Sequence, residues 1–429
     1  PKDGLIVVEP GGGLHINGST ITNACGQVWQ GIQVWGDNSQ PQGQGGQGQL
    51  TVIGSTIEHA REAISPWQVG NFPRPDGTGG AGGVVHAYDS RFVNNWRSAG
   101  FMQYQVGGQY WSSFTRCTVS FVDNALQNFL GHISAWDIAA LEINGCIFKD
   151  ERSQKTGDPY GIYTLSASVH ATADRVRGVL PRQKNLFEGL SRAVEIGSDA
   201  TQGSWVVDQS HFQDNWRGVI VRANAGVRVL RSDFEVNQYQ NQPFFSYGLG
   251  ILHQGAFVVE QNEFSYDGNA PSNFASLGIW VDDTKGGYNR LRNNEFETNT
   301  FGIYVNGDNG EDGINLQSGL QIWCNEFIDE AHDFSLFNAP SDPYGASVAD
   351  DHGDIDEPAK NRFSTPLVPF SGQDWHMNND GSGMPTVNYW LPQNPQPEEI
   401  PTDIVNVNRI NSAGNGSLNF CAGRATGAI

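Results

Sequence analysis

A degenerate repeat runs through most of this 429-residue chain, and it constrains the fold more than any other feature. Its frame reads Ser/Asn-x-Phe, then Asn, then Gly-Ile/Val-x-Val, as in residues 210–221 and 294–305. The first position of the frame, here called the marker, recurs every 22 to 39 residues. The markers are Ser19, Ser55, Ser90, Cys117, Cys146, Asn185, Ser210, Ser232, Asn262, Asn294, Asn325 and Asn361. A unit of this length that recurs along a chain predicts a solenoid and not several globular domains.

Apolar and polar residues alternate before each marker. Leu14 and Ile16, for example, stand five and three positions before Ser19, with a polar residue between them. A period of two predicts a strand with one buried face, and the Gly-Ile-x-Val stretch is a second strand of this kind. Two or three short strands per coil, separated by Gly and Asn turns, predict an all-β, right-handed parallel β-helix of about 12 coils without covering helices.

The markers are small or polar, so we expect them at a bend, where they stack from coil to coil as a polar ladder. Cys117 and Cys146 hold the marker position in consecutive coils. Their separation of about 4.8 Å suits a disulfide and a pair of stacked thiols equally. Cys324 and Cys421 offer a way to tie the tail back to the last coils. Cys25 is the fifth cysteine, so the five cannot all pair within one chain.

The repeat predicts coils over residues 1–338, interrupted by loop insertions near 37–49 and 66–83. From 339 to 429 the frame fades while Pro, Asp and Asn become frequent, so we expect the last coil, an irregular loop-rich cap and an exit segment there. A cap is needed because the end coil of a solenoid has unpaired strand edges. The chain has no initiating Met and opens directly on strand-like sequence, so we expect it to belong to a longer protein.

Charge and composition narrow the partners of the protein. The formal net charge is −21, which repels phosphate backbones and argues against nucleic acid as a partner. No run of 18 apolar residues is present, so the sequence predicts no membrane span. Little Lys, much Asn, Gln and Trp, and scattered Cys predict an exported protein that is extracellular or held at the cell surface.

The frame Asn-x-Phe-x-x-Asn-x-x-Gly-Ile-x-Val resembles the repeat of pectate-lyase-like parallel β-helix proteins over roughly residues 5 to 365. A narrower motif, in residues 11–14, 23–26 and 28–36, resembles the β-helix modules of large secreted surface proteins of gliding bacteria, which are often exported by the type IX route. The first resemblance implies the fold. The second implies a non-catalytic structural or adhesive module that serves cell attachment or a surface appendage. Its partners would be a cell-surface glycan or protein, or other domains or subunits of a larger assembly.

Two alternatives remain open at this stage. One is a polysaccharide lyase or glycoside hydrolase that acts on acidic glycans, and the other is a tailspike-like trimeric receptor-binding protein. Enzymes that resemble this fold use carboxylates, or a base with acidic residues, on an exposed sheet. No acid pair stands on neighbouring coils with a base beside it, which favours binding over catalysis. The candidate catalytic residues are Glu195, Arg222, Asp282 and Asp283.

The x position of Gly-Ile-x-Val faces solvent if the Ile and Val beside it face inward. In several coils this outward position is apolar or aromatic, and a row of exposed apolar side chains predicts a contact surface for sugar rings or for another protein. A covering loop or a neighbouring domain is the alternative. The predicted surface consists of Tyr163, Ile220, Leu252, Trp280 and Tyr304.

One acidic segment is a candidate metal site. Residues 350–357 hold five carboxylates, and carboxylate oxygens suit Ca²⁺. The candidate ligands are Asp350, Asp351, Asp354 and Asp356, and a solvated loop is the alternative. No cofactor other than Ca²⁺ is predicted.

Overall fold

The structure is a computed structural model, and its described residues form two compact units. The units are Pro1–Asn215 and Trp216–Ile429. The structure describes residues 3–23, 26–71, 80–104, 110–123, 128–174, 182–197, 204–222, 226–239, 244–253, 255–268, 274–284, 287–310, 319–337, 348, 351–352, 358–364, 375–379, 387–402, 404–405, 407–411 and 421.

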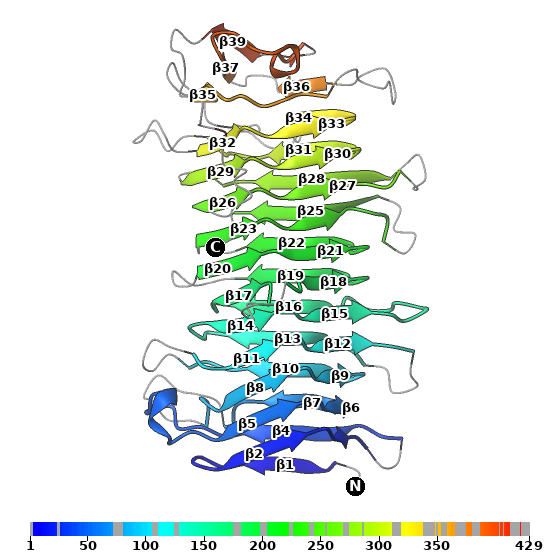
Figure 1. Ribbon diagram of the computed structural model, residues 1–429, viewed down its shortest axis with the longest axis vertical. Helices are drawn as coiled ribbons and strands as arrows, with labels where there is room; N and C mark the ends of the chain where they lie inside the picture. The colour runs from blue at the N-terminus through cyan, green and yellow to red at the C-terminus, as the bar shows by residue number, and fades with distance from the viewer. Residues whose placement is uncertain are drawn as a thin grey trace. The chain divides into compact units, whose positions relative to one another are not determined.

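The first unit consists of three sheets, to which each coil adds one short strand (Figure 1). Sheet A contains β1 (Leu5–Val8), β4 (Trp29–Val34), β7 (Ala60–Ser65), β10 (Arg97–Phe101), β13 (Gly131–Trp136), β16 (Tyr160–Leu165) and β19 (Arg192–Gly197). Sheet B contains β2 (Gly13–Asn17), β5 (Gln49–Ile53), β8 (Val84–Tyr88), β11 (Ser113–Thr115), β14 (Leu141–Asn144), β17 (Val169–Thr172) and β20 (Ser204–Asp208). Sheet C contains β3 (Thr20–Ile21), β6 (Thr56–Glu58), β9 (Arg91–Val93), β12 (Thr118–Phe121), β15 (Ile147–Asp150), β18 (Asn185–Glu188) and β21 (Ser210–Gln213).

The second unit repeats this plan and adds a small fourth sheet. Its sheet A contains β22 (Arg217–Arg222), β25 (Phe245–Leu252), β28 (Ala275–Asp282), β31 (Phe301–Asn306), β34 (His332–Phe337), β36 (Trp375–Asn379) and β38 (Ile404–Val405). Sheet B contains β23 (Gly226–Leu230), β26 (Phe257–Glu260), β29 (Tyr288–Arg292) and β32 (Gly319–Trp323). Sheet C contains β24 (Asp233–Glu235), β27 (Glu263–Ser265), β30 (Glu295–Glu297) and β33 (Glu326–Ile328). The fourth sheet contains β35 (Asp351–His352), β37 (Val387–Leu391) and β39 (Val407–Asn411).

These strands make the protein an all-β, right-handed parallel β-helix, which confirms the predicted fold class. Within each sheet, neighbouring strands pair in parallel, as β13 does with β16 and β25 with β28. The helices of the described residues are two short 3₁₀ segments, η1 (Gln42–Gln44) in the first predicted loop insertion and η2 (Pro397–Glu399). Within the same ranges, no helix has the length and apolar character needed to cross a membrane.

Every marker except Asn185 follows a residue whose backbone takes the left-handed conformation. The preceding residue has a φ of 54° at Asn293 and 55° at Cys324, for example. Along most of the stack, the backbone N–H of a marker then donates to the side chain of the marker in the next coil, as it does at Ser19, Ser55, Cys117 and Cys146 in the first unit. In the second unit this ladder runs from Ser232 through Asn262, Asn294 and Asn325 to Asn361, with N···O distances of 2.9–3.1 Å. The predicted polar ladder is therefore present.

The Phe of the frame forms a second continuous column inside each unit. Phe148, Phe187 and Phe212 stack face to face in the first unit, with ring centroids 4.9 Å apart. In the second unit Phe234, Phe264, Phe296 and Phe327 stack in the same way at 4.7–5.1 Å. All seven rings are buried. Burial of an aromatic side chain contributes roughly 1.5–3 kcal/mol, so this column supplies much of the core.

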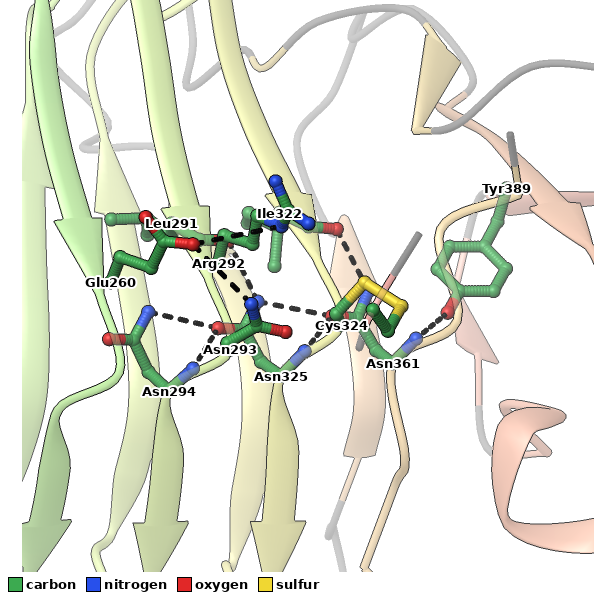
Figure 2. The surroundings of a disulfide bond; sticks show 11 residues. Glu260, Leu291, Arg292, Asn293, Asn294, Ile322, Cys324, Asn325, Asn361 and Tyr389 are labelled. Atoms are coloured by element: carbon green, nitrogen blue, oxygen red, sulfur yellow. Dashed lines mark hydrogen bonds and ion pairs between the residues drawn. A yellow bond between two sulfur atoms is a disulfide. The ribbon is translucent and has the colours of Figure 1, made fainter. Parts of the chain in front are cut away.

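The ladder ends at a tyrosine beside the disulfide (Figure 2). The N–H of Asn361 donates to the hydroxyl oxygen of Tyr389, which takes the place of a further marker side chain. Cys324, which directly precedes the marker Asn325, forms a disulfide with Cys421 across 97 residues of sequence. Cys117 and Cys146 remain free thiols and are fully buried, and the Cys117 N–H donates to the Cys146 sulfur at 3.4 Å.

The predicted calcium ligands lie mostly outside the described residues. Asp350, Asp354 and Asp356 are not described, and only the backbone of Asp351 is described, in β35. Cys25 also lies outside the described residues. Elsewhere in the described ranges, no three His, Cys, Asp or Glu side chains gather as a metal site. Calcium binding at 350–357 therefore stays a prediction.

Two buried carboxyl groups replace frame residues in one coil of the second unit. Glu330 stands where other coils have the frame Asn, and Asp333 stands where they have the frame Gly. Glu330 accepts from the N–H of Asn299 at 2.9 Å. Asp333 accepts from the hydroxyl and the N–H of Ser364 at 2.6 and 3.0 Å. Burial raises the pKa of Asp333 to about 8 and raises that of Glu330 as well.

We expect Asn294→Ala to lower the free energy of unfolding by about 2–4 kcal/mol. The change removes the acceptor for the Asn262 N–H and the amide that donates to the Val259 carbonyl, and unpaired buried groups of this kind cost about 1–3 kcal/mol each. Urea denaturation measures the loss. Asn17→Ala, at an exposed position, is the control and should have little effect. Equal stability of the two variants would contradict the role of the ladder.

Asp333 should make the protein less stable as the pH rises. Its raised pKa of about 8, against an ordinary 3.8, means that the folded chain keeps a proton that the unfolded chain releases. The free energy of unfolding therefore declines from about pH 4 to about pH 8 and then levels off. Asp333→Asn imitates the neutral acid, so it should be more stable than the parent at pH 8 by at least about 1.4 kcal/mol, the equivalent of one pKa unit.

Urea denaturation across this pH range tests the prediction for Asp333. The difference between parent and variant should grow steadily with pH, because only the parent ionises at this position. A constant difference at all pH values would show that Asp333 is not the group that titrates.

Candidate functional site

The outward face of sheet A in the second unit carries a cluster of aromatic side chains over β25, β28 and β31. The pairing register sets two outward columns across these strands. Tyr247 pairs with Leu277, which pairs with Phe301, and in the other column Gly250 pairs with Trp280, which pairs with Tyr304. One residue from each coil therefore contributes to each column.

The cluster has a buried layer and a partly exposed layer. Ile220, Tyr247, Leu252 and Leu277 are at most 7% exposed. Phe245, Trp280, Phe301 and Tyr304 pack on them and are half-buried. We call these last four residues the aromatic surface. An apolar surface that lies outside the β-helix core and is only partly covered by its own chain is typical of a contact site.

Edge-to-face contacts hold the rings of the aromatic surface in place. Trp280 contacts Tyr247 and Phe245 with centroid separations of 5.6 and 6.2 Å, and Phe301 contacts Tyr304 at 5.4 Å. Such pairs add about 0.5–1.5 kcal/mol each beyond the area they bury. The rings are therefore positioned before any ligand arrives. The indole N–H of Trp280 is buried and makes no hydrogen bond in the described part of the chain.

Polar groups lie along one side of the aromatic surface, where the strands of sheet A end. Asp282 on β28 accepts a hydrogen bond from the side-chain amide of Asn306 on β31 at 3.0 Å. Asp283 follows in a left-handed bend and lies 3.5 Å from a ring nitrogen of His253. Burial and the nearby Asp282 carboxylate raise the pKa of Tyr304 to about 12.

Two residues of the predicted contact surface are partly exposed in the second unit and two are not. Trp280 and Tyr304 are half-buried and face outward, whereas Ile220 and Leu252, which we expected to be exposed, are buried at 0% and 5%. The ring of Tyr247 explains why Ile220 is buried. The ring lies over Gly250, which is the pairing partner of Ile220. A Cβ added at Gly250 would stand only 2.7 Å from this ring.

Leu252 belongs to a different column from the one predicted. It pairs with Asp282, and Gly250 is the true partner of Trp280. The frame glycine of this coil is Gly248, so the motif begins two residues earlier than the sequence suggested.

Tyr163, the remaining member of the predicted surface, lies in the first unit. It is half-buried, pairs with Glu195 and contacts the ring of Tyr160 at 5.5 Å. Arg192 donates to the Glu195 carboxylate and lies 3.1 Å from Asp158. Glu195, one of the predicted catalytic acids, is thus 8% exposed and engaged in a structural ion pair.

The other predicted catalytic residues do not form an acid pair with a base beside it. Asp282 and Asp283 are adjacent in sequence, with Asp282 bound to Asn306 and Asp283 facing His253 and the N–H of Asp308. Arg222 is exposed and follows Val221, which pairs with Ile251 on β25, so it is two strands away from Asp282.

Sequence reasoning missed a charged pair on sheet A of the first unit. Glu62 on β7 and Arg97 on β10 are paired in register and form an ion pair at 3.1 Å. Glu62 also accepts from the Ser65 hydroxyl at 2.6 Å. Burial raises the pKa of Glu62 against the lowering effect of Arg97, while its side chain stays 20% exposed. Gly100 leaves room for the pair, since a Cβ there would stand 2.5 Å from the carboxylate.

Comparisons with known proteins give no match to any protein family and none to a curated protein sequence. Among solved structures, the periplasmic alginate epimerase AlgG is similar. A double mutant of AlgG is 13% identical, with 78% of this chain and 79% of that chain covered and a TM-score of 0.28. Unmutated AlgG is also 13% identical, with 78% of each chain covered and a TM-score of 0.24. The fold assignment rests on the parallel sheets themselves, and we draw no functional argument from this likeness.

Proposed function

We propose that the protein is a glycan-binding β-helix module of an exported bacterial protein and that it holds its ligand without converting it. The observation that carries the proposal is the aromatic surface of Phe245, Trp280, Phe301 and Tyr304. The face of an aromatic ring is electron-rich and attracts the weakly positive C–H groups on the face of a sugar ring. The neighbouring Asp282 and Asn306 offer partners for sugar hydroxyls.

Export is supported by the covalent chemistry of the chain. The disulfide between Cys324 and Cys421 suits an oxidising compartment outside the cytosol. The net charge of −21 disfavours nucleic acid as the ligand. Attachment to the cell surface and export by the type IX route rest on the resemblance of residues 11–14, 23–26 and 28–36 and are part of the proposal.

Replacing Trp280 tests the binding function. Trp280→Ala should raise the Kd for a bound oligosaccharide about tenfold or more, because a central aromatic residue usually dominates binding energy. Trp280→Phe keeps a ring and should have an intermediate Kd. A glycan array on the parent chain finds the ligand, and isothermal titration calorimetry measures the Kd values.

Trp111→Ala is the matched control, because Trp111 is 49% exposed and lies in the first unit. Circular dichroism shows whether the variants remain folded. A folded parent that binds no glycan on the array, or a folded Trp280→Ala with an unchanged Kd, would refute the proposal.

A second candidate, a polysaccharide-cleaving enzyme, is favoured by one observation. Glu62 has a raised pKa and lies beside Arg97 on an outward sheet face, and a carboxyl group with a raised pKa is suited to act as a general acid. This candidate would use the first unit, not Asp282 or Asp283.

The enzyme candidate predicts measurable formation of new chain ends from a polysaccharide. Glu62→Gln should lower that rate by about 10²-fold or more, as removal of a general acid commonly does. Asp267→Asn, at an exposed position, should leave the rate unchanged. Absence of product from both neutral and acidic polysaccharides with the folded parent would exclude this candidate and leave the binding function in place.

A further inference from the structure

We propose that the aromatic surface binds a chain of neutral sugar units that lies across β25, β28 and β31, and that it discriminates against uronic-acid polymers. The inference rests on the proposed glycan-binding function and specifies the ligand of the same site. It follows from the direction of the ring columns, from the polar groups beside them and from the charge at their edge.

The direction of the ligand follows from the register of the strands. The strands β25, β28 and β31 are neighbours in sheet A (Figure 1). Phe245 lies on β25, Trp280 on β28, and Phe301 and Tyr304 on β31, so the rings follow one another across the strands. Neighbouring strands are about 4.8 Å apart, which is close to the length of one sugar ring. A polysaccharide that lies across the strands therefore presents successive sugar units to successive coils, whereas a chain along one strand meets few rings.

The polar groups at the edge of the surface suit hydroxyl groups. Asp282 supplies carboxylate oxygens, Asn306 supplies an amide, and the two already share a hydrogen bond of 3.0 Å that fixes their orientation. Hydroxyl groups both donate and accept, so a neutral sugar matches this mixed set.

The charge at the same edge disfavours a uronate. Asp282 pairs with Leu252, and it lies in the column next to that of Trp280. The negative charge of its carboxylate helps to raise the pKa of the Tyr304 hydroxyl. Asp283 adds a second carboxylate at the adjoining bend, with His253 as its neighbour. A sugar carboxylate placed over Trp280 would meet like charge, which is unfavourable when no bound cation intervenes.

Among the described residues, two arginines lie at the other end of the cluster, on the strand that pairs with β25. Arg217 and Arg222 are both on β22, and the guanidinium of Arg217 lies over the ring of Trp216 at 3.9 Å. On β34, His332 stacks on Phe301 at 4.7 Å. In the described part of the chain, the rings of Trp280 and Tyr304 are therefore flanked by Asp282 and Asn306, and these two arginines stand two or three strands away.

Calorimetry with two oligosaccharides of equal length tests the inference. The probes are cellohexaose, which is neutral, and hexagalacturonate, which carries a carboxylate on every unit. At low ionic strength and without divalent cations, we expect the Kd for hexagalacturonate to be at least about fivefold higher. Added salt should narrow the gap, because it screens like-charge repulsion.

Asp282→Asn keeps the shape of the side chain and removes its charge. It should lower the Kd for hexagalacturonate about fivefold relative to the Kd for cellohexaose, because both ligands share the contacts of this side chain to their hydroxyl groups and only hexagalacturonate meets its charge. Asp267→Asn makes the same change of net charge at an exposed position on another face and should affect neither ligand. Thermal melts confirm that both variants are folded.

The outcomes separate this inference from the proposed function. Binding of hexagalacturonate as tight as that of cellohexaose, or an Asp282→Asn variant that gains no affinity for hexagalacturonate relative to cellohexaose, overturns the inference and leaves glycan binding intact. Binding of neither probe by the folded parent, together with an empty glycan array, overturns both.

Discussion

One backbone N–H per coil is the constraint on which the rest of the structure depends. The left-handed bend before nearly every marker points the marker N–H toward the next coil and away from water. A buried N–H without an acceptor costs about 1–3 kcal/mol, so each coil must supply an acceptor on a short side chain. Ser, Asn and Cys meet this need, and they are the residues found at the marker positions.

The fold could be predicted because its determinants are local and repeated. The marker, the alternating strand before it and an apolar residue after it, most often Phe, recur from coil to coil, and one-dimensional stacking turns a local pattern into the whole architecture. The ladder and the Phe column follow directly from these positions. Whether Cys117 and Cys146 are bonded could not be predicted, because stacked markers have a suitable spacing in either state. As free thiols they serve the ladder, where the Cys146 sulfur accepts the N–H that an Asn oxygen accepts elsewhere.

The outward face was harder to predict because its register depends on single glycines. Near Gly248 the alternation skips a residue, so Tyr247 and Gly250 face the same side although they are three positions apart. If the Gly-Ile-x-Val motif is counted from Gly250, Leu252 is assigned to the wrong column. The same count does not reveal that the ring of Tyr247 faces outward and covers Ile220. Glu62 and Arg97 were missed for a related reason. Both residues stand before the Gly-Ile-x-Val motif of their coils, and the outward columns were counted from that motif. Charged residues of opposite sign on successive coils were the signal that could have indicated this pair.

The disulfide at the end of the ladder also changes how the second unit can come apart. A coil inside a solenoid is held by two neighbours, whereas an end coil is held by one, so opening begins at the ends. The bond between Cys324 and Cys421 anchors the tail to the coil that carries Asn325. When β37 and β39 open, the chain therefore stays tethered near its docking position. The strands can then re-form their pairing without a wide conformational search. The terminus of the stack is protected against progressive unzipping even though its last strands carry few ladder bonds.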